Sequence, residues 1–255
     1  MARIFITGSS DGLGLLAAKS LISKGHRVVL HARNETRAKT TEKEAPEAEK
    51  VLVGDLSSLD ETKNLAKQVN ELDPFNAIIH NAGIYHVPNN AKSIDGIPLI
   101  FAVNSIAPYI LTALVNKPER LIYLSSGLHM QGNASIERLT TLLDGKNVPG
   151  YSDTKLHDIL IALSVARKWP GVFSNAVNPG WVPTKMGGRG APDNLAEGYA
   201  TQVWLAVGED EGAKCSGKYL YHKKEMNFNQ QATKTDIQEK FLSVCEHITG
   251  IKFGN

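Results

Sequence analysis

Short apolar runs alternate along the chain with longer stretches whose apolar residues recur at helical spacing. The runs are rich in Val and Ile, and we expect strands at Arg3–Thr7, Arg27–Leu30, Val51–Val53, Ala77–Ile79, Leu121–Leu124 and Val172–Val177. The helices expected around them are Gly14–Lys24, Thr36–Lys43, Leu59–Leu72, Ser152–Lys168, Ala196–Val207 and Thr233–His247. Strands that alternate with helices, and apolar runs that are continuous along each strand, predict an α/β fold with a parallel sheet covered on both faces.

Composition excludes several classes of protein. The 255 residues contain no linker, low-complexity tract or repeat, which predicts one domain over residues 1–255. The net charge of +2 comes from scattered basic residues, so neither nucleic-acid binding nor membrane binding is expected. The eight histidines form no HxxxH or HExxH arrangement, so no metal site is expected. Two cysteines without a CxxC pair, and the lack of a long apolar run, predict a cytoplasmic protein.

The first predicted strand runs into a glycine-rich turn and then into a helix. Gly8 allows a tight turn, Gly12 lets the backbone approach a pyrophosphate, and Gly14 lets the helix pack closely. The helix N-terminus offers free N–H groups and a positive dipole end to phosphates. A merely structural loop can also carry glycines, but this turn's place in an alternating α/β chain favours dinucleotide binding. The residues expected to bind it are Thr7, Gly8, Ser9, Ser10, Asp11, Gly12, Leu13 and Gly14.

The spacing Thr-Gly-x-x-x-Gly-x-Gly resembles that of the short-chain dehydrogenase/reductase family. Other matches follow in the family's order across nearly the whole chain: Asp55-Leu56, His80-Asn81-Ala82-Gly83, Asn104, Ser125-Ser126, Tyr151-x-x-x-Lys155, and Asn178-Pro179-Gly180 with Thr184. The resemblance implies a single-domain Rossmann fold, a doubly wound parallel sheet of about seven strands. It also implies that the cofactor is bordered by Asp55, Leu56, Asn81, Ala82, Gly83, Pro179, Gly180, Val182 and Thr184.

The Tyr-x-x-x-Lys motif carries the predicted chemistry. Helical spacing puts Tyr151 and Lys155 on one face, one turn apart. A free phenol titrates at about pH 10, and a nearby ammonium stabilises its phenolate form. By resemblance, Tyr151 is the general acid/base, Ser126 holds the substrate oxygen, and Lys155 also bonds the nicotinamide ribose. Asn104 supports a water that links Lys155 to solvent, and Ser125 is expected to make only local hydrogen bonds.

One departure from the family's commoner pattern concerns the spacing between Ser126 and Tyr151. The two residues are 25 positions apart, so Gly127–Gly150 holds an insertion, with a turn expected at Asp144-Gly145. The longer spacing resembles the retinol-dehydrogenase-like branch. It predicts a flexible flap at the substrate mouth, with His129 either lining it or lying in a surface loop. Substrate loops are expected around 84–91, 127–150 and 181–192.

The end of the second strand bears on the choice of cofactor. An acid there would favour NAD(H), but the sequence reads Ala32-Arg33-Asn34, and Arg33 can hold a 2′-phosphate. Asp11 points the other way, because NADP-preferring relatives often carry a basic residue in the glycine turn. NADP(H) is favoured and NAD(H) stays open.

Three functions compete. The leading prediction is a carbonyl reductase or alcohol dehydrogenase for a small or medium apolar molecule. The alternatives are a nicotinamide-sensing regulatory protein without turnover and a nucleotide-sugar epimerase; the retained Tyr and Lys disfavour the first, and the short chain after Gly180 disfavours the second. The expected partner is a small-molecule carbonyl or alcohol substrate. A homodimer is also open, although the helix after Asn104 is expected to end before Lys117-Pro118.

Overall fold

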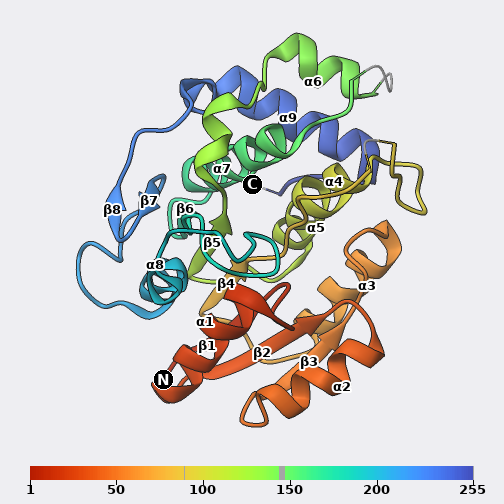
Figure 1. Ribbon diagram of the computed structural model, residues 1–255. Coiled ribbons are helices and arrows are strands. Elements are labelled where there is room, and N and C mark those ends of the chain that lie inside the picture. The colour runs from red at the N-terminus through yellow and green to blue at the C-terminus, as the bar shows by residue number, and fades with distance from the viewer. Residues whose placement is uncertain (89, 144–146, 255) are drawn as a thin grey trace.

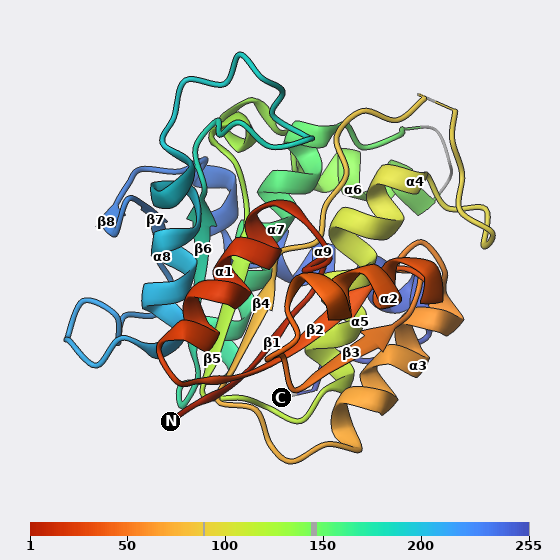
Figure 2. The ribbon, with the colours of Figure 1, turned by 60° about the horizontal axis from the view of Figure 1, so that its bottom comes forward.

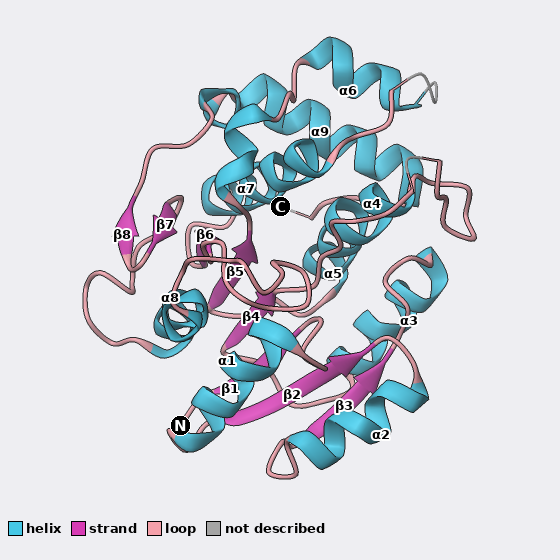
Figure 3. Ribbon diagram, in the orientation of Figure 1, coloured by secondary structure: helices cyan, strands magenta, loops and turns pink. Residues whose placement is uncertain are grey.

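The computed structural model describes residues 1–88, 90–143 and 147–254 of the chain. The sheet has eight strands in the order β3-β2-β1-β4-β5-β6-β7-β8 (Figures 1 and 3). All neighbouring strands are parallel except β7 and β8. The strands are β1 (Arg3–Ile6), β2 (Arg27–Ala32), β3 (Lys50–Val53), β4 (Ala77–His80), β5 (Arg120–Leu124), β6 (Phe173–Asn178), β7 (Tyr219–Tyr221) and β8 (Lys224–Glu225). The predicted α/β Rossmann fold is therefore confirmed, and the pattern did not predict the short strands β7 and β8.

Helices cover both faces of the sheet, as expected. They are α1 (Gly12–Ser23), α2 (Glu35–Glu44), α3 (Leu59–Asn70), α4 (Leu99–Phe101), α5 (Ala107–Leu114), α6 (Ile136–Leu143), α7 (Tyr151–Lys168), α8 (Leu195–Val207) and α9 (Thr235–Thr249). Alternate residues of β1 point to opposite faces, so Ile4 and Ile6 pack in a core with α1 and α8 while Phe5 packs in a core with α3, α5 and α7. The side view in Figure 2 shows these layers.

Local sequence explains where several helices begin. Asn34, Ser58 and Asn194 precede α2, α3 and α8, and each side chain accepts a hydrogen bond from a backbone N–H of the first turn. Asp60 and Glu61 in the first turn of α3 suit the positive end of the helix dipole. Helix α1 differs, because its N-terminus has no side-chain cap. Its free N–H groups therefore stay available to an anion.

Helix α7 is enclosed by the rest of the chain. Every residue from Asp153 to Val165 is buried. The helix packs on β5 and β6 on one side, and α9 lies against it on the other (Figure 1). A second copy of the chain could therefore reach this helix at its two ends but not along its middle.

The inserted segment between Ser126 and Tyr151 is largely helical over its described part. It forms a 3₁₀ turn at Gly127–Gln131 and then α6, which packs against α9. Asp153 in the first turn of α7 binds the segment, accepting from Asn133 N at 2.8 Å and Arg138 Nη2 at 2.9 Å. The turn predicted at Asp144-Gly145 lies outside the described residues.

Candidate active site

The predicted site residues follow the ends of four neighbouring parallel strands. Thr7 follows β1, Asn81 follows β4, Ser126 comes soon after β5, and Pro179 follows β6. Carboxyl ends of parallel strands share one edge of a sheet, so these residues lie along the same edge. The crevice at this edge is the usual ligand site of a doubly wound sheet.

The glycine turn is held against the loop after β4. Asn81 Nδ2 donates to the carbonyl oxygens of Thr7 and Gly8, both at 3.0 Å. Thr7 Oγ1 in return accepts from the N–H groups of Asn81 and Ala82, both at 3.1 Å. Gly8 has φ +61°, and a Cβ there would meet Ala82 Cα at 2.8 Å. The turn thus needs glycine both for its conformation and for its approach to Ala82.

His31 supports this turn from β2, which the sequence did not predict. Its Nδ1 accepts from Gly8 N at 2.9 Å, and its Nε2 contacts Gly54 O at 2.8 Å. Burial lowers the pKa of His31, more than the hydrogen bond to Gly54 and the charge of Asp55 raise it. A polar residue inside an otherwise apolar strand run is the signal that could have found it.

Residues after β6 complete the site around the first turn of α1. A cavity of about 460 Å³ lies between the start of α1, α2 and the loop before α8. It is lined by Ser10, Asp11, Gly12, Leu15, Leu16, Arg37, Thr40, Glu44, Pro183, Thr184, Lys185 and Leu195. Leu13 and Val182 pack together over Gly198 of α8, where a Cβ would meet Val182 Cγ1 at 2.8 Å. The Pro179–Thr184 segment therefore lies beside the glycine turn.

Asp11 in the glycine turn is neutralised by two cations. Arg37 on α2 forms an ion pair with its carboxylate, and Lys185 Nζ donates to it at 3.0 Å. Partial burial would raise the pKa of Asp11, but its bonds to Lys185 and Arg37 lower it overall. Arg33 is exposed, and no described residue hydrogen-bonds its guanidinium. The sequence identified Arg33 but missed Arg37, which lies in the first turn of α2.

Asp55 and Leu56 lie just after β3. Asp55 Oδ1 accepts from Ser57 N at 2.9 Å and from Ser57 Oγ at 2.8 Å, so one carboxylate oxygen is used within the turn. Leu56 is buried and packs in the core on the α3 side of the sheet. The structure thus gives both residues local roles, and their expected contact with the cofactor stays a prediction.

Tyr151 is the first residue of α7 and is partly exposed at the sheet edge. Its ring lies 4.4 Å, between centroids, from the ring of Tyr85 in the loop after β4. No described residue hydrogen-bonds the Tyr151 hydroxyl. The hydroxyl is therefore free to bind a ligand.

Lys155 lies one helical turn after Tyr151 and is buried. Its Nζ lies 5.7 Å from the centre of the Tyr151 ring and donates to Leu124 O at 2.6 Å. It also donates to Asp158 Oδ2 at 2.9 Å, a partner the sequence missed. Burial would lower the pKa of Lys155, but the Asp158 and Tyr151 charges raise it overall, so the ammonium stays charged.

The two serines after β5 differ in their contacts. Ser125 Oγ is buried and donates to Lys155 O at 2.6 Å, which ties β5 to α7. Ser126 Oγ is partly exposed and accepts from Leu128 N at 3.2 Å, leaving its proton free to be donated. His129 is buried and neither lines a flap nor lies in a surface loop; its Nδ1 contacts Ser126 O at 2.6 Å and its Nε2 accepts from Asn229 N at 3.3 Å.

Asn104 lies in a π-helical turn, Ala102–Ile106, between α4 and α5. Its amide bonds both backbone groups of Ile84, accepting from N at 2.8 Å and donating to O at 2.9 Å. It also donates to Thr154 Oγ1 at 3.1 Å. Asn104 therefore joins the loop after β4 to α7, next to Lys155.

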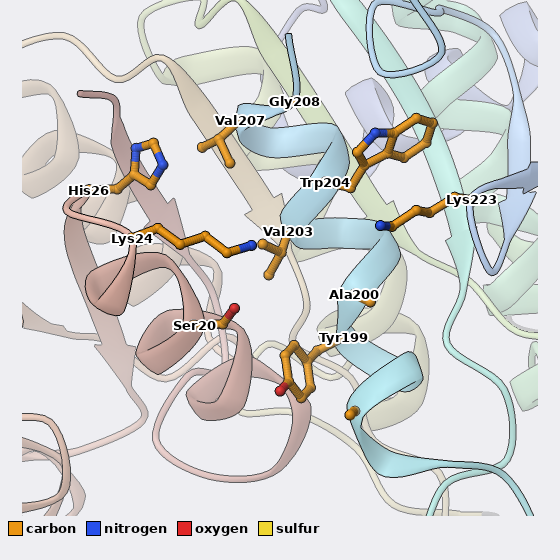
Figure 4. A pocket seen from close by; sticks show the side chains of 11 residues that line it. Ser20, Lys24, His26, Tyr199, Ala200, Val203, Trp204, Val207, Gly208 and Lys223 are labelled. Carbon is orange, nitrogen blue, oxygen red and sulfur yellow. The ribbon is translucent and has the colours of Figure 1, made fainter. Parts of the chain in front are cut away.

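A second hollow lies far from this edge. It is bounded by the last turn of α1 and by α8 and includes Lys24, His26, Tyr199, Trp204 and Lys223 (Figure 4). Since α1 begins at the carboxyl edge of the sheet and ends at the other, this hollow is not part of the candidate active site.

Comparisons with known proteins agree with this geometry. A family model described as short chain dehydrogenase matches residues 2–194. The chain belongs to the short-chain dehydrogenase family. An uncharacterised oxidoreductase of Emericella nidulans is 43% identical over 98% of both chains. The short-chain dehydrogenase chyC of Penicillium rubens is 42% identical over 99% of both.

Retinol dehydrogenase 14 of Mus musculus is 28% identical, over 97% of this chain and 86% of its own. The retinol-dehydrogenase-like branch inferred from the Ser–Tyr spacing is thereby confirmed. Solved structures show the same fold in other short-chain dehydrogenases. An uncharacterised protein from Mycobacterium Paratuberculosis superposes with a TM-score of 0.82 at 20% identity, covering 100% of this chain and 96% of its own. Among the described residues, no helix is long and apolar enough to cross a membrane.

Proposed function

We propose that this short-chain dehydrogenase is an NAD(P)(H)-dependent oxidoreductase that interconverts a carbonyl and an alcohol, with Tyr151 as general acid/base. The observation that carries the proposal is the meeting, at one sheet edge, of the uncapped N-terminus of α1 with the free hydroxyl of Tyr151 and the buried ammonium of Lys155. An anion-binding helix end beside a proton donor is what a dinucleotide-dependent carbonyl chemistry requires.

The residues present fit a nicotinamide dinucleotide. The N–H groups of the first turn of α1 are free for a pyrophosphate, and Thr184 borders the same cavity. Asn81, Ala82 and Gly83 form the backbone wall next to the glycine turn, and Gly180 has φ +81° where the chain turns after β6. When bound, the nicotinamide supplies or accepts the hydride.

The chain's own residues position the substrate and move the proton. Tyr151 donates its hydroxyl proton to a carbonyl oxygen in reduction and takes a proton from the alcohol in oxidation. Lys155 stabilises the phenolate form, since its ammonium is held near the ring. Ser126 donates its free proton to the substrate oxygen. Asn104 holds the backbone of Ile84 and the hydroxyl of Thr154, so it keeps the cofactor wall and the Tyr151 helix in register.

We infer a preference for NADP(H). Arg33 follows β2 and is exposed, while Arg37 in the first turn of α2 donates to Ser10 Oγ at 3.3 Å and lines the cavity. An adenosine 2′-phosphate held at the end of β2 would meet these two cations. Asp11 would repel such a phosphate, but Arg37 and Lys185 already neutralise it. A related solved structure, a blue fluorescent protein from a metagenomic library at 18% identity and a TM-score of 0.69 over 86% of this chain and 95% of its own, is a complex with NADPH.

The substrate is expected to have an apolar, preferably planar body. Tyr85 lies against Tyr151 and is 39% exposed, while Trp181 and Met186 in the loop before α8 are 59% and 41% exposed. Large apolar side chains exposed on loops at a site edge offer contact area to an apolar ligand.

The test is a fluorescence titration with NADPH and NADH, followed by a screen of aromatic and aliphatic carbonyls with the tighter cofactor. The Tyr151→Phe variant serves as the matched control, because it keeps the ring and loses only the hydroxyl. We expect cofactor binding in both proteins and turnover only in the unsubstituted one. Binding without turnover of any carbonyl would favour the nicotinamide-sensing alternative, and full activity of Tyr151→Phe would overturn the role of Tyr151.

A further inference from the structure

Helix α7 carries a third ionisable residue in line with Tyr151 and Lys155. Asp158 lies seven residues after Tyr151 and three after Lys155, so all three side chains share one helix face. The side chains of Lys155 and Asp158 are only 5% and 3% exposed, and Nζ and Oδ2 are 2.9 Å apart. Lone charges are rarely buried so fully, because each needs a partner to replace water.

The pair fixes the direction of the Lys155 ammonium. Two of its three N–H donors are used, one by Leu124 O and one by Asp158 Oδ2. A Cβ built at Gly83 would lie 3.4 Å from Nζ, which puts the ammonium beside the loop after β4. One donor is therefore left for a ligand at the sheet edge.

The remaining groups around Asp158 are neutral near pH 7. Tyr123 of β5 faces Asp158, and burial raises its pKa. His80 of β4 stacks on Tyr123 at 4.7 Å, and burial lowers its pKa to about 3. His157 on α7 bonds Ser105 of the π-helical turn and stacks on Phe241 of α9, and burial lowers its pKa to about 4. The ammonium and the carboxylate are thus the charges that face each other here.

Asp158 is too far from Tyr151 to touch it. Seven residues of α-helix span roughly 10 Å, with Lys155 in between. At that distance in a buried site, a full charge still acts on the ionisation of a phenol. The carboxylate opposes the ammonium, so the phenolate of Tyr151 is stabilised less than it would be by Lys155 alone.

We propose that Asp158 is a positioning residue of the active site, which holds the Lys155 ammonium in place and offsets part of its charge at Tyr151. Burial raises the pKa of Asp158 to about 6 although Lys155 lowers it, so the carboxylate carries its charge above that pH. The inference rests on the proposed function, because Asp158 positions a catalytic group only if Tyr151 is the general acid/base. Its test measures the ionisation of Tyr151 and needs no enzymatic turnover.

The experiment follows the ionisation of Tyr151 by NMR in protein labelled with ¹³Cζ-tyrosine, with Tyr151→Phe used to assign the resonance. In Asp158→Asn, the midpoint of the Tyr151 titration should fall by about one pH unit. Asp158→Glu keeps the negative charge, so its Tyr151 midpoint should lie close to that of the unsubstituted protein. Glu239→Gln is the control, because it removes a carboxylate paired with Arg167 and Lys168 at the other end of α7. The same midpoint in Asp158→Asn and the unsubstituted protein would overturn the proposal.

A second measurement covers the case in which Asp158→Asn does not fold. In the unsubstituted protein, the ¹⁵Nζ resonance of Lys155 should shift as Asp158 titrates between pH 5 and 7, because the two atoms are in contact. A flat resonance there would also overturn the proposal. NADPH titration of the same samples separates the two ideas: a shifted midpoint without cofactor binding contradicts only the proposed function, and binding with an unshifted midpoint contradicts only the role of Asp158.

Discussion

His31 shows how one side chain can hold two strands' ends and a loop together. Its ring spans from the Gly8 N–H to the Gly54 carbonyl, and both are backbone groups at the cofactor edge. A buried backbone group that loses its partner costs free energy, because no water replaces it. The residue therefore supports both stability and the shape of the glycine turn.

We expect His31→Leu to lower the free energy of unfolding by about 3 kcal/mol, since two backbone groups lose their partner. NADPH binding should weaken as well, because the Gly8 turn is no longer held. Thermal unfolding and a fluorescence titration measure the two effects. His247→Leu, at an exposed position on α9, is the control and should change neither. A variant as stable as the unsubstituted protein would contradict the bridging role.

Arg33 is the residue on which the cofactor choice can be tested directly. We expect Arg33→Ala to raise the Kd of NADPH at least tenfold and to change that of NADH little, because only NADPH carries the 2′-phosphate. Arg167→Ala, an arginine on α7 away from the cavity, is the control. Equal losses for both cofactors would show that Arg33 does not read the phosphate.

The residues found by sequence are those in motifs with fixed spacing, such as Gly8, Tyr151 and Lys155. The residues missed act through tertiary contacts. Arg37 meets Asp11 from 26 positions away, and His31 meets Gly8 from 23. No local pattern encodes the partners in such approaches, although the polar His31 stands out in an apolar strand run. Asp158 differs, because its spacing from Tyr151 and Lys155 on one helix also indicates its partner.

At the scale of elements, the sequence predicted the strands and helices with strong periodicity and missed the short ones. Strands β1 to β6 each contain an apolar run, whereas β7 and β8 are only three and two residues long and are too short to show a pattern. The segment from Leu99 to Leu114 is divided by a π-helical turn, which breaks the helical period at Asn104. Helix α6 has its apolar face on α9, so only the tertiary structure explains it.

The Asp153 carboxylate ties the inserted segment to the first turn of α7, in addition to the packing of α6 on α9. Burial would raise the pKa of Asp153, but the N–H groups of Asn133 and Gly150 and the Arg138 guanidinium lower it overall. A lowered folded-state pKa gives stability that is present above the unfolded value and is lost as pH falls through the folded value. The anchor is therefore fully present at neutral pH and weakens in acid.

We expect Arg138→Gln to speed hydrogen exchange in residues 127–143 by several-fold at pH 7, because Asp153 loses its cation and α6 its link to α7. The core strands should exchange as before. Mass spectrometry of peptides from both regions makes the comparison. An unchanged exchange rate in residues 127–143 would mean that the packing of α6 on α9 holds the segment in place without the Arg138–Asp153 ion pair.

At the scale of the whole molecule, buried neutral histidines link stability to pH. Burial lowers the pKa of His80 to about 3 and of His157 to about 4. The unfolded chain binds protons on both below about pH 6.5, and the folded chain does not until those values are reached. The stability that these neutral histidines contribute is thus present above about pH 6.5 and is lost as pH falls. Asp158 acts in the opposite direction, because burial raises its pKa.

As pH is lowered from 6 to 4.5, we expect the free energy of unfolding to fall by about 1.4 kcal/mol per pH unit for each of these histidines. His157→Gln removes one titrating group and keeps a partner for Ser105. The slope of stability against pH should fall by that amount in the variant, measured by urea unfolding at several pH values. Equal slopes of unfolding free energy against pH in the variant and the unsubstituted protein would mean that His157 is already charged in the folded protein.

The loop before α8 is closed at its base. Trp181 N donates to Asp193 Oδ2 at 2.6 Å, and Asp193 N donates to Trp181 O at 3.0 Å, so the two ends are fastened to each other. Val182, Thr184 and Lys185 lie at the glycine turn, but the segment from Met186 to Pro192 can change in length without disturbing the strands below. Gene copies of this enzyme could therefore diverge in what they accept while inheriting the same catalytic apparatus, and a designer could exchange the segment between relatives as a cassette.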